Sequence, residues 1–586
     1  MLTTLSPEMA RILSLPIKPA PEDAHYTQRP EIEALYKHRK PTRDFHLNPR
    51  QVCALVDLLD LGGCLGALPV GEGKTLVGIL GAKLLGAKRP LYLTKATRVD
   101  GIREEMETHK HRFHFPTNLK VASWEGVLSR PEGAKLLTDY RPDYIAADEA
   151  HLICNATSAR TKRFLRYFME LEQAGEPLPK CLIMSGTITK RGIKDYYHLA
   201  AFALKDKSPL PLTQDELEAW AAVLDAGQDA ALSPMAMFKP MVQAVDAGAW
   251  SKLNPLMQKF LAPDERQTQE ACRIAYQRRL ETCPGVVIGK ESSVSAALEL
   301  VIDTNYKPDL LTQQRMEALR LAPEEFGLNP PTDVQSPSAY KEYVDNFVRE
   351  KSRQLVQGFQ YIPHWPKGRD DGWLNARARF ASTLRRELES RASAEYDSPA
   401  LVVREIERGG GKATPEMITA WEGWKLEKNK PEPEQNVFWV SQDFLEYVSA
   451  AITDLVKAGP LIVWCEYKEF GSKLAAAWGL PYHGQGSAVP SGPLCFASRA
   501  VHGTGHNLQQ YNRFLGIAPV CHAAAWEQWI GRHHRQGQDA DEVTGYIILP
   551  SPSFVNKWEA ALEEAQYLEQ TTGMKQKILF ADKRYV

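Results

Sequence analysis

The chain has 586 residues, which is too long for a single hydrophobic core and indicates about three or four units. Its 71 basic and 72 acidic side chains nearly cancel, so the overall charge indicates no nucleic-acid partner, and any such site has to be a local patch. No segment approaches the roughly 18 apolar residues of a membrane span, and the nine cysteines form no C-x-x-C pair, so we expect a soluble intracellular protein without a zinc site.

The first part of the chain has two distinct patterns. Residues 1–45 are rich in proline and charge and predict an extended arm with one short helix. Residues 52–59 carry apolar side chains at helical spacing and predict an amphipathic helix, which leads to a short apolar run at residues 64–68.

Residues 67–75 read Ala-Leu-Pro-Val-Gly-Glu-Gly-Lys-Thr, with Gly71, Gly73, Lys74 and Thr75 spaced as in a phosphate-binding loop. An apolar run precedes this segment and an amphipathic run follows it, which predicts strand, tight turn and helix. Glycines let backbone amides point at a polyphosphate, the lysine contacts the β and γ phosphates, and the threonine hydroxyl is a ligand for Mg²⁺. Leu68 replaces the first glycine of the general pattern, so an ordinary glycine-rich turn is the alternative.

Gln51 lies one short helix upstream of this loop. Its amide both donates and accepts hydrogen bonds, so it is well placed to read the edge of an adenine base. A solvated glutamine at the start of a helix explains the residue equally well.

Strand patterns at residues 90–94, 119–123 and 144–147 alternate with helical stretches and predict a parallel α/β sheet. The third of these strands ends in Asp148 and Glu149, about 70 residues after the phosphate-binding loop. Hydrolysis of ATP with Mg²⁺ needs such a pair. We expect Asp148 to hold the Mg²⁺ shell and Glu149 to orient and deprotonate the attacking water.

A further strand at residues 181–184 runs into Ser185, Gly186 and Thr187. Small hydroxyl residues beside the two carboxylates can sense the γ phosphate. We expect them to pass that signal to a neighbouring lobe.

Residues 206–440 are mainly helical and carry no motif of known chemistry. Residues 349–391 within them contain ten basic and five acidic side chains, with Trp365 and Trp373 interleaved. Arg377 and Arg379 are therefore candidates for contact with nucleic-acid phosphates. A solvated helix face with two core tryptophans accounts for the pattern equally well.

The α/β pattern returns over residues 441–550, with strands at 460–465 and 493–496. It ends in Gly-Arg-His-His-Arg-Gln-Gly-Gln at residues 531–538, where Arg532 and Arg535 are three apart and are predicted to share one face of a helix. From a second lobe these arginines can stabilise charge on a γ phosphate. A helix with surface charge is the alternative, but it does not explain why glycines, histidines and glutamines cluster there.

Together these motifs resemble superfamily 2 helicase-like ATPases. The ending G-R-x-H-R-x-G-Q, with Gln528, is most similar to the Swi/Snf branch of double-stranded DNA translocases. The resemblance covers about residues 45–200 and 440–550. It has three departures: the turn at residues 500–505 is one residue longer and carries His502, Ile188 replaces a usual proline, and the sequence of the segment between the lobes has no match.

The resemblance implies a role for each matching residue. Gln51 corresponds to the adenine reader, Gly71, Gly73, Lys74 and Thr75 to the ligands of phosphate and Mg²⁺, and Asp148 and Glu149 to the hydrolytic pair. Ser185, Gly186, Thr187 and Gln528 correspond to coupling residues, and Arg532 and Arg535 to arginine fingers. Gly503 and Gly505 belong to a motif that touches nucleotide and DNA. Further candidates for nucleic-acid contact are Ser498, Arg499 and Asn507, which are close to this motif in the sequence, and Lys95 in the first lobe.

We therefore predict an α/β protein with two RecA-like lobes, residues 46–205 and 441–550, and a helical insertion at 206–440. A C-terminal helix at about residues 554–569, within the segment 551–586, is predicted to brace the lobes. ATP and Mg²⁺ are the expected cofactors, bound in the cleft between the lobes. The expected partner is double-stranded or branched DNA, gripped without sequence specificity.

Three other functions stay open: a strand-separating DNA or RNA helicase, an RNA-directed enzyme, and a non-catalytic ATP-gated scaffold. No Asn-Gly turn between alternating strands indicates a strand-splitting hairpin, and the closing motif argues against RNA. The short flanks are similar to compact bacterial and phage forms, which implies the cytoplasm of a bacterial or phage-infected cell.

Overall fold

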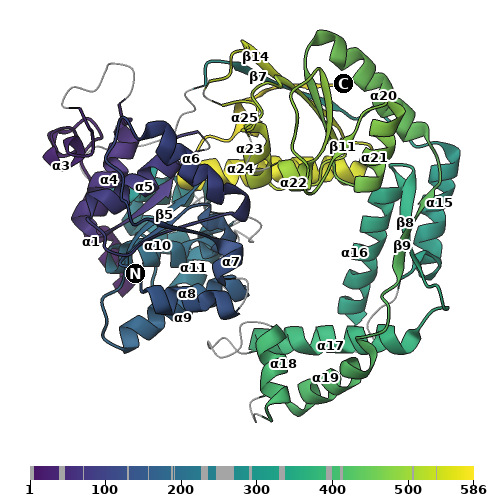
Figure 1. Ribbon diagram of the computed structural model, residues 1–586, viewed down its shortest axis with the longest axis horizontal. Coiled ribbons are helices and arrows are strands. Elements are labelled where there is room, and N and C mark those ends of the chain that lie inside the picture. Colours follow the sequence, from purple (N-terminus) through teal and green to yellow (C-terminus); the bar gives the residue numbers. More distant parts are fainter. Residues whose placement is uncertain are drawn as a thin grey trace. The chain divides into compact units, whose positions relative to one another are not determined.

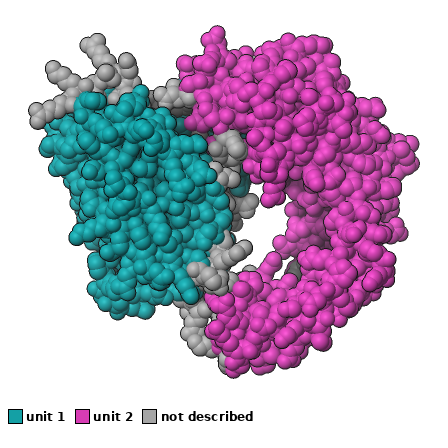
Figure 2. All heavy atoms as spheres, viewed as in Figure 1, with its two compact units in different colours: residues 1–294, 522–531, 560–580 teal, residues 295–521, 532–559, 581–586 magenta. Residues whose placement is uncertain are grey.

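The structure is a computed structural model, drawn in Figure 1. It describes residues 5–38, 46–69, 71–128, 131–155, 158–186, 189, 192–225, 235–245, 269–289, 294–328, 337–390, 399–409, 413–503, 507–535 and 537–586. The chain forms two compact units, coloured separately in Figure 2. Unit 1 comprises Met1–Val294, His522–Gly531 and Ala560–Phe580, and unit 2 comprises Ser295–Cys521, Arg532–Glu559 and Ala581–Val586.

Unit 1 is built on a six-stranded sheet in the order β3-β2-β4-β5-β1-β6, with all neighbours parallel. Its strands are β1 (Gly63–Ala67), β2 (Pro90–Thr94), β3 (Lys120–Ser123), β4 (Tyr144–Ala147), β5 (Lys180–Ser185) and β6 (Val286–Ile288). Parallel strands need crossover connections, and helices cover both faces of this sheet. The α/β class predicted from the sequence is confirmed.

The helices of unit 1 pack on the sheet through two hydrophobic clusters, one on each face. Alternate residues of a strand point to opposite faces, so Ile145 and Ala147 of β4 join one cluster while Tyr144 and Ala146 join the other. The helices include α4 (Pro49–Leu61), α5 (Lys74–Leu84), α6 (Val99–His109), α7 (Trp124–Leu128), α8 (Pro131–Tyr140), α9 (Ala159–Gln173), α10 (Tyr197–Leu204), α11 (Gln214–Leu224), α12 (Lys239–Val245) and α14 (Gln269–Glu281).

The N-terminal region differs from the predicted extended arm, because its described part is docked into unit 1. It forms α1 (Pro7–Ser14), α2 (Ala24–Thr27) and α3 (Pro30–Glu33). Met9 and Ile12 of α1 are buried in one core cluster. The Arg11 guanidinium donates to the carbonyl oxygens of Asp206, Ser208 and Leu210, at 2.6 to 2.8 Å. The arginine thus satisfies carbonyls at the end of a loop far along the chain, which composition could not indicate.

The boundaries predicted for the helical insertion also differ from those of the structure. Residues 206–294 belong to unit 1, where their helices and β6 complete the core and the sheet edge. The next strand, β7 (Ala297–Asp303), lies within the sheet of unit 2 between β14 and β15. The predicted insertion of residues 206–440 is therefore not a single helical unit.

Unit 2 contains a seven-stranded parallel sheet in the order β11-β12-β10-β13-β14-β7-β15. Its further strands are β10 (Leu461–Cys465), β11 (Tyr482–His483), β12 (Leu494–Ser498), β13 (Arg513–Ile517), β14 (Glu542–Ile548) and β15 (Asp582–Tyr585). The helices α20 (Asp443–Leu455), α21 (Lys468–Ala477) and α22 (Arg499–His502) connect them. Two all-parallel sheets with a helical segment between them are consistent with two RecA-like lobes.

The described residues between 337 and 439 of unit 2 form a projection, which we call the helical projection. Figure 1 shows α16 running beside the antiparallel pair β8 and β9, with α17, α18 and α19 gathered at the far end. The elements of this region, with the helix that precedes it, are α15 (Leu310–Leu321), α16 (Pro337–Leu355), β8 (Phe359–His364), α17 (Asp371–Ser390), α18 (Pro399–Glu407), α19 (Pro415–Glu427) and β9 (Glu434–Trp439). The sequence did not predict this antiparallel pair. Its strands are joined through three helices and not through a tight turn.

The C-terminal region contributes to both units. Helix α23 (Ala523–Ile530) and α25 (Lys577–Phe580) belong to unit 1, and the division between the units falls inside α24 (Pro552–Thr572). The predicted C-terminal helix is confirmed, but the predicted tail forms β15, an edge strand paired with β7. Among the described residues, no helix is both long and apolar enough to cross a membrane.

Candidate ATP-binding and hydrolysis site

The candidate site of unit 1 lies at the carboxyl edge of its sheet. β1, β5 and β4 are neighbours, so the segments that follow them lie side by side. These segments carry the phosphate-binding loop, Ser185, and the pair Asp148 and Glu149 respectively. The topology therefore brings together three motifs that are about 35 to 120 residues apart in the chain.

The phosphate-binding loop has the backbone conformation that its glycines permit. Gly71 and Gly73 have φ angles of +97° and +72°. A Cβ atom on Gly73 would lie 2.2 Å from Nε2 of Gln51, so a larger residue would displace the Gln51 side chain and strain the positive-φ backbone. Lys74 Nζ donates to the carbonyl oxygens of Leu68 and Pro69, each at 2.9 Å. The lysine is thus folded over the loop, at the start of α5.

Gln51 contacts the loop directly. Its Nε2 donates to the Glu72 carbonyl oxygen at 3.1 Å, and its Oε1 accepts from the Asn48 amide at 2.9 Å. The Gln51 amide in turn donates to Oδ1 of Asn48, which completes a capping box at the start of α4. Gln51 is therefore a buried capping residue that touches the phosphate-binding loop, and the solvated alternative is wrong. Its role in reading adenine stays a prediction.

Asp148 and Glu149 follow β4 and are largely buried. Asp148 Oδ2 accepts from the Thr94 hydroxyl at 3.2 Å, and its Oδ1 accepts from the Glu149 amide at 3.0 Å. Burial, together with the charge of Glu149, raises the pKa of the Asp148 carboxyl. Burial opposes the ionisation of Glu149 as well, but the hydrogen bond and charge of His151 and the charge of Lys74 outweigh it and lower that pKa.

Glu149 has a left-handed backbone conformation, with φ of +54°. This conformation is costly for a residue with a Cβ and is common where a side chain is held for function. It turns the chain sharply at the end of β4, into the short 3₁₀ helix Ala150–Ile153.

His151 is a site residue for which the sequence predicted no role. Its Nδ1 lies 3.2 Å from Glu149 Oε2 and 3.3 Å from the Ser185 hydroxyl. It thereby connects the second carboxylate with the end of β5. Its position two residues after Glu149 was the only available signal, and that spacing alone does not show which side chain it faces.

The predicted coupling residues are described in part. Ser185 is the last residue of β5 and is fully buried, and Gly186 follows it. Thr187 lies outside the described residues. Gln528 is buried on α23 in unit 1.

Lys95, a candidate for nucleic-acid contact, lies near the carboxylates. Its charge, like that of Lys74, contributes to lowering the pKa of Glu149. Arg98, three residues further on, acts in the same sense on the pKa of Asp148. The segment after β2 thus contributes to the positive potential of the site.

The fit to Mg²⁺ rests on Thr75 and Asp148. Thr75 is the second residue of α5 and is largely buried, and the Asp148 carboxylate is buried beside a second carboxylate. Oxygen donors of this kind suit Mg²⁺, which takes few protein ligands when phosphate oxygens complete its shell. Among the described residues, no group of three or more His, Cys, Asp or Glu side chains forms a different metal site.

The candidates in unit 2 lie around α22. Ser498 caps this helix, and its hydroxyl accepts from the Val501 amide at 3.4 Å. The Arg499 guanidinium forms a two-pronged ion pair with Glu466, with Nη2 at 2.9 Å from Oε2. A Cβ on Gly503 would lie 2.5 Å from the Arg499 carbonyl oxygen, so glycine is needed there. Asn507 is exposed, and Gly505 lies outside the described residues.

Arg532 and Arg535 do not lie on a helix, which corrects the prediction. Helix α23 ends at Ile530, and residues 532–535 follow it in turns. The reason is long-range anchoring of the two histidines between the arginines. His533 donates through Nδ1 to the Tyr511 carbonyl oxygen at 2.9 Å. Nε2 of His534 lies 2.8 Å from the Ala296 carbonyl oxygen. The backbone carbonyl oxygen of Arg532 also accepts from the Leu508 amide at 3.2 Å, so this acceptor is used outside the helix.

Arg377 and Arg379 are exposed on α17 of the helical projection. Trp373 of the same helix is buried, and its ring packs edge to face with those of Trp365 and Trp424 at 5.6 and 5.5 Å. The Arg377 guanidinium lies over the Trp373 ring, 4.9 Å from its centre. Trp373 is therefore a core residue, while the arginines lie on a solvated face.

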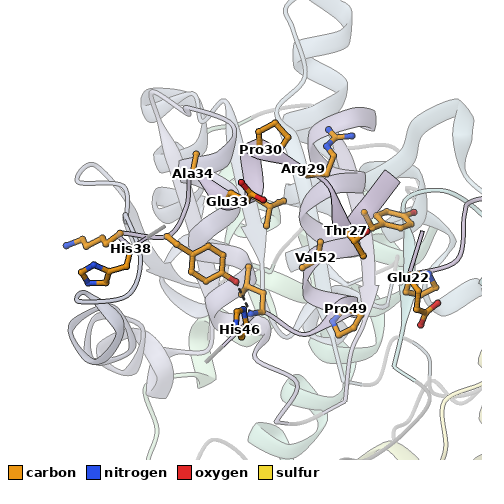
Figure 3. A pocket seen from close by; sticks show the side chains of 16 residues that line it. Glu22, Thr27, Arg29, Pro30, Glu33, Ala34, His38, His46, Pro49 and Val52 are labelled. Atoms are coloured by element: carbon orange, nitrogen blue, oxygen red, sulfur yellow. Dashed lines mark hydrogen bonds between the residues drawn. The ribbon is translucent and has the colours of Figure 1, made fainter. Parts of the chain in front are cut away.

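A cavity of about 870 Å³ lies beside α4, shown in Figure 3. Pro49 and Val52 of α4 line it, together with Arg29, Tyr36 and His46. Gln51 is on another side of α4, against the phosphate-binding loop, and does not line this cavity. The cavity is thus separate from the candidate site.

A scan against models of known protein families finds none that matches this chain, and a search of curated proteins finds no match either. The likeness to superfamily 2 ATPases rests on the motifs and is consistent with the two parallel sheets.

Proposed function

We propose that the protein is an ATP hydrolase. The observation that carries the proposal is the convergence of Lys74, Asp148, Glu149 and Ser185 at one edge of the first sheet. A phosphate-binding loop, a buried carboxylate pair and a small hydroxyl residue are the groups that phosphoryl transfer to water requires.

Each group has a specific task in this proposal. Lys74 and the amides at the start of α5 bind the β and γ phosphates. Thr75 and Asp148 hold Mg²⁺, which neutralises charge on the phosphates. Glu149 orients the attacking water and takes its proton, and His151 holds the Glu149 carboxylate in place. Arg532 and Arg535 supply positive charge to the transition state.

We further propose that hydrolysis drives movement along double-stranded or branched DNA. The similarity of residues 531–538 to the Swi/Snf branch supports this function, and the exposed arginines of α17 offer phosphate contacts without sequence specificity. A strand-separating helicase would need a wedge. The antiparallel pair β8 and β9 does not supply a hairpin tip of that kind, because α17, α18 and α19 join its strands.

The deciding experiment compares ATPase rates without nucleic acid and with single-stranded DNA, double-stranded DNA or RNA. Double-stranded DNA should stimulate hydrolysis most, and the protein should displace the third strand of a triplex while separating a plain duplex poorly. Stimulation should weaken as salt rises. Efficient unwinding of a tailed duplex without triplex displacement would instead establish the helicase.

A paired variant tests the helical projection in the same assay. Replacing Arg377 and Arg379 with glutamine should weaken duplex binding. The slope of the logarithm of the binding constant against the logarithm of the salt concentration should fall in magnitude by about one for each lost phosphate contact. Lys457→Gln, an exposed lysine of unit 2, is the matched control. An unchanged slope in the arginine variant would assign the phosphate contacts to other residues.

A further inference from the structure

Two buried tyrosines of the first sheet pack against α5, the helix that carries Thr75 as its second residue. Tyr92 is the middle residue of β2, and Tyr144 is the first residue of the neighbouring strand β4. Both rings belong to the core cluster on the α5 side of the sheet. A Cβ on Gly78 would lie 2.6 Å from Cε2 of Tyr92, and a Cβ on Gly81 would lie 2.6 Å from the Tyr144 hydroxyl. The two glycines of α5 thus make room for the two rings.

The hydroxyls of these tyrosines differ in their hydrogen bonding. The Tyr144 hydroxyl donates to the Gly78 carbonyl oxygen at 2.9 Å. The Tyr92 hydroxyl is fully buried and forms no hydrogen bond within the part of the chain that the structure describes. An unbonded hydroxyl in a core is costly, and a phenylalanine would fill nearly the same space without that cost. The presence of this hydroxyl therefore indicates that it has a partner in another state of the protein.

Hydrogen bonds between β2 and the end of β4 hold Asp148 close to Tyr92. The Asp148 amide donates to the carbonyl oxygen of Leu93, the next residue along β2, at 2.8 Å. The Thr94 hydroxyl donates to Asp148 Oδ2 at 3.2 Å. The same strand thus holds Asp148 at its end and reaches α5 through the Tyr92 ring.

Thr75 is the residue of α5 that lies closest to the Tyr92 hydroxyl in chemical effect. It is three residues before Gly78, on which the Tyr92 ring packs, so the two share one side of the helix. Burial raises the pKa of the Tyr92 phenol well above its usual range, and the charge of Asp148 acts in the same sense. The Thr75 hydroxyl, which is near enough to stabilise a phenolate, opposes this rise in pKa. The Tyr92 hydroxyl is therefore close to both residues that are proposed to hold Mg²⁺.

We propose that Tyr92 is a positioning residue for Thr75, whose hydroxyl donates a hydrogen bond to the Tyr92 phenolic oxygen when nucleotide and Mg²⁺ are bound. This inference rests on the proposed function, in which Thr75 is a ligand of Mg²⁺. A hydroxyl that binds a cation presents a lone pair to it, so its proton has to point elsewhere. A buried acceptor for that proton fixes the orientation of the hydroxyl, as outer hydrogen-bond partners do for other metal ligands.

The test compares Tyr92→Phe with Tyr144→Phe, which removes the hydroxyl of the neighbouring strand. The full chain is titrated by calorimetry with the β,γ-imido analogue of ATP, which is not hydrolysed, in saturating Mg²⁺ and in EDTA. In Tyr92→Phe the factor by which Mg²⁺ strengthens binding of the analogue should fall about 10-fold, while binding in EDTA stays as in the wild type. Tyr144→Phe should keep the wild-type factor. Equal weakening of binding with and without Mg²⁺ in Tyr92→Phe would contradict a role directed at the metal ligand.

Unfolding in urea without nucleotide is the second measurement. Tyr144→Phe should raise the equilibrium constant for unfolding about 2- to 10-fold, because it removes a hydroxyl that is bonded in the folded chain. Tyr92→Phe should not raise this constant, since its hydroxyl has no bond to lose. An equal loss of stability in the two variants would show that the Tyr92 hydroxyl is already bonded without nucleotide, which the inference excludes.

A double-mutant cycle with Thr75→Val identifies the group that Tyr92 positions. In the Thr75→Val background, Tyr92→Phe should cause no further change in the effect of Mg²⁺, since the hydroxyl that it orients is gone. Independent losses that multiply, or a wild-type effect of Mg²⁺ in Tyr92→Phe alone, would overturn the inference. A wild-type effect of Mg²⁺ in Thr75→Val would instead show that Thr75 does not hold the metal, and the proposed function would fail at that residue. Circular dichroism checks that each variant is folded at the assay temperature.

Discussion

In the proposed mechanism Lys74 acts on the phosphates of ATP and Glu149 on the attacking water, so their variants should fail in different ways. Lys74→Ala removes a cation that contacts the phosphates and should weaken ATP binding by about 10- to 100-fold. Glu149→Gln keeps the size of the side chain but removes the base, and should lower kcat by about 100- to 10,000-fold with ATP still bound. Titration with a fluorescent ATP analogue and steady-state rates measure both quantities.

Lys83→Ala is the control for this pair, since Lys83 is exposed on the same helix α5. It should bind and hydrolyse ATP like the wild type. Near-normal turnover in both Lys74→Ala and Glu149→Gln would remove the assigned site altogether.

At the scale of elements, the segment of residues 531–535 carries two buried histidines, His533 and His534. The His533 ring stacks on Phe514 of β13, with ring centres 4.8 Å apart, and lies against Trp464 of β10. Burial lowers the pKa of His533 to about 4. The folded segment therefore holds a neutral imidazole.

This buried imidazole predicts a pH-dependent stability. The unfolded chain takes up a proton at His533 below about pH 6.5, whereas the folded chain does so only near pH 4. The stabilisation of the folded chain by the neutral His533 is therefore complete above pH 6.5 and is lost as the pH falls from 6.5 to 4. Over this range the free energy of unfolding should fall by roughly 3 kcal/mol. Urea unfolding of the wild type and His533→Asn at pH 8, 6 and 5 measures it, since asparagine can still donate to the Tyr511 carbonyl oxygen.

In that comparison the asparagine variant should lose less stability than the wild type as the pH falls. His364→Asn, at an exposed histidine of the same unit, is the control. Parallel pH profiles for the wild type and His533→Asn would show that His533 does not cause the dependence.

At the scale of the whole molecule, unit 1 is assembled from distant parts of the chain. Its larger core cluster contains Met9, Trp220, Tyr276 and Met574. We therefore expect a fragment of residues 1–205, the predicted N-terminal arm with the predicted first lobe, not to fold, because it lacks much of that cluster and the edge strand β6. Circular dichroism during heating should show no cooperative transition for the fragment and a clear one for the full chain. A cooperative transition in the fragment would contradict this dependence on later segments.

The sequence by itself determined the local features of the first sheet and of the candidate site. A strand, a glycine turn and a helix follow one another within about 20 residues around Lys74, and β4 ends directly at Asp148, so short-range patterns were sufficient. Only the tertiary structure decided the features that depend on distant partners. The short strands β6 and β15 carry too few residues for a pattern and pair with strands more than 200 residues away. Residues 532–535 lie outside the helix, where His533 and His534 contact carbonyl oxygens at residues 511 and 296 and the Arg532 carbonyl oxygen accepts from the Leu508 amide. The connection of His151 to Ser185 exists only because β4 and β5 are neighbours.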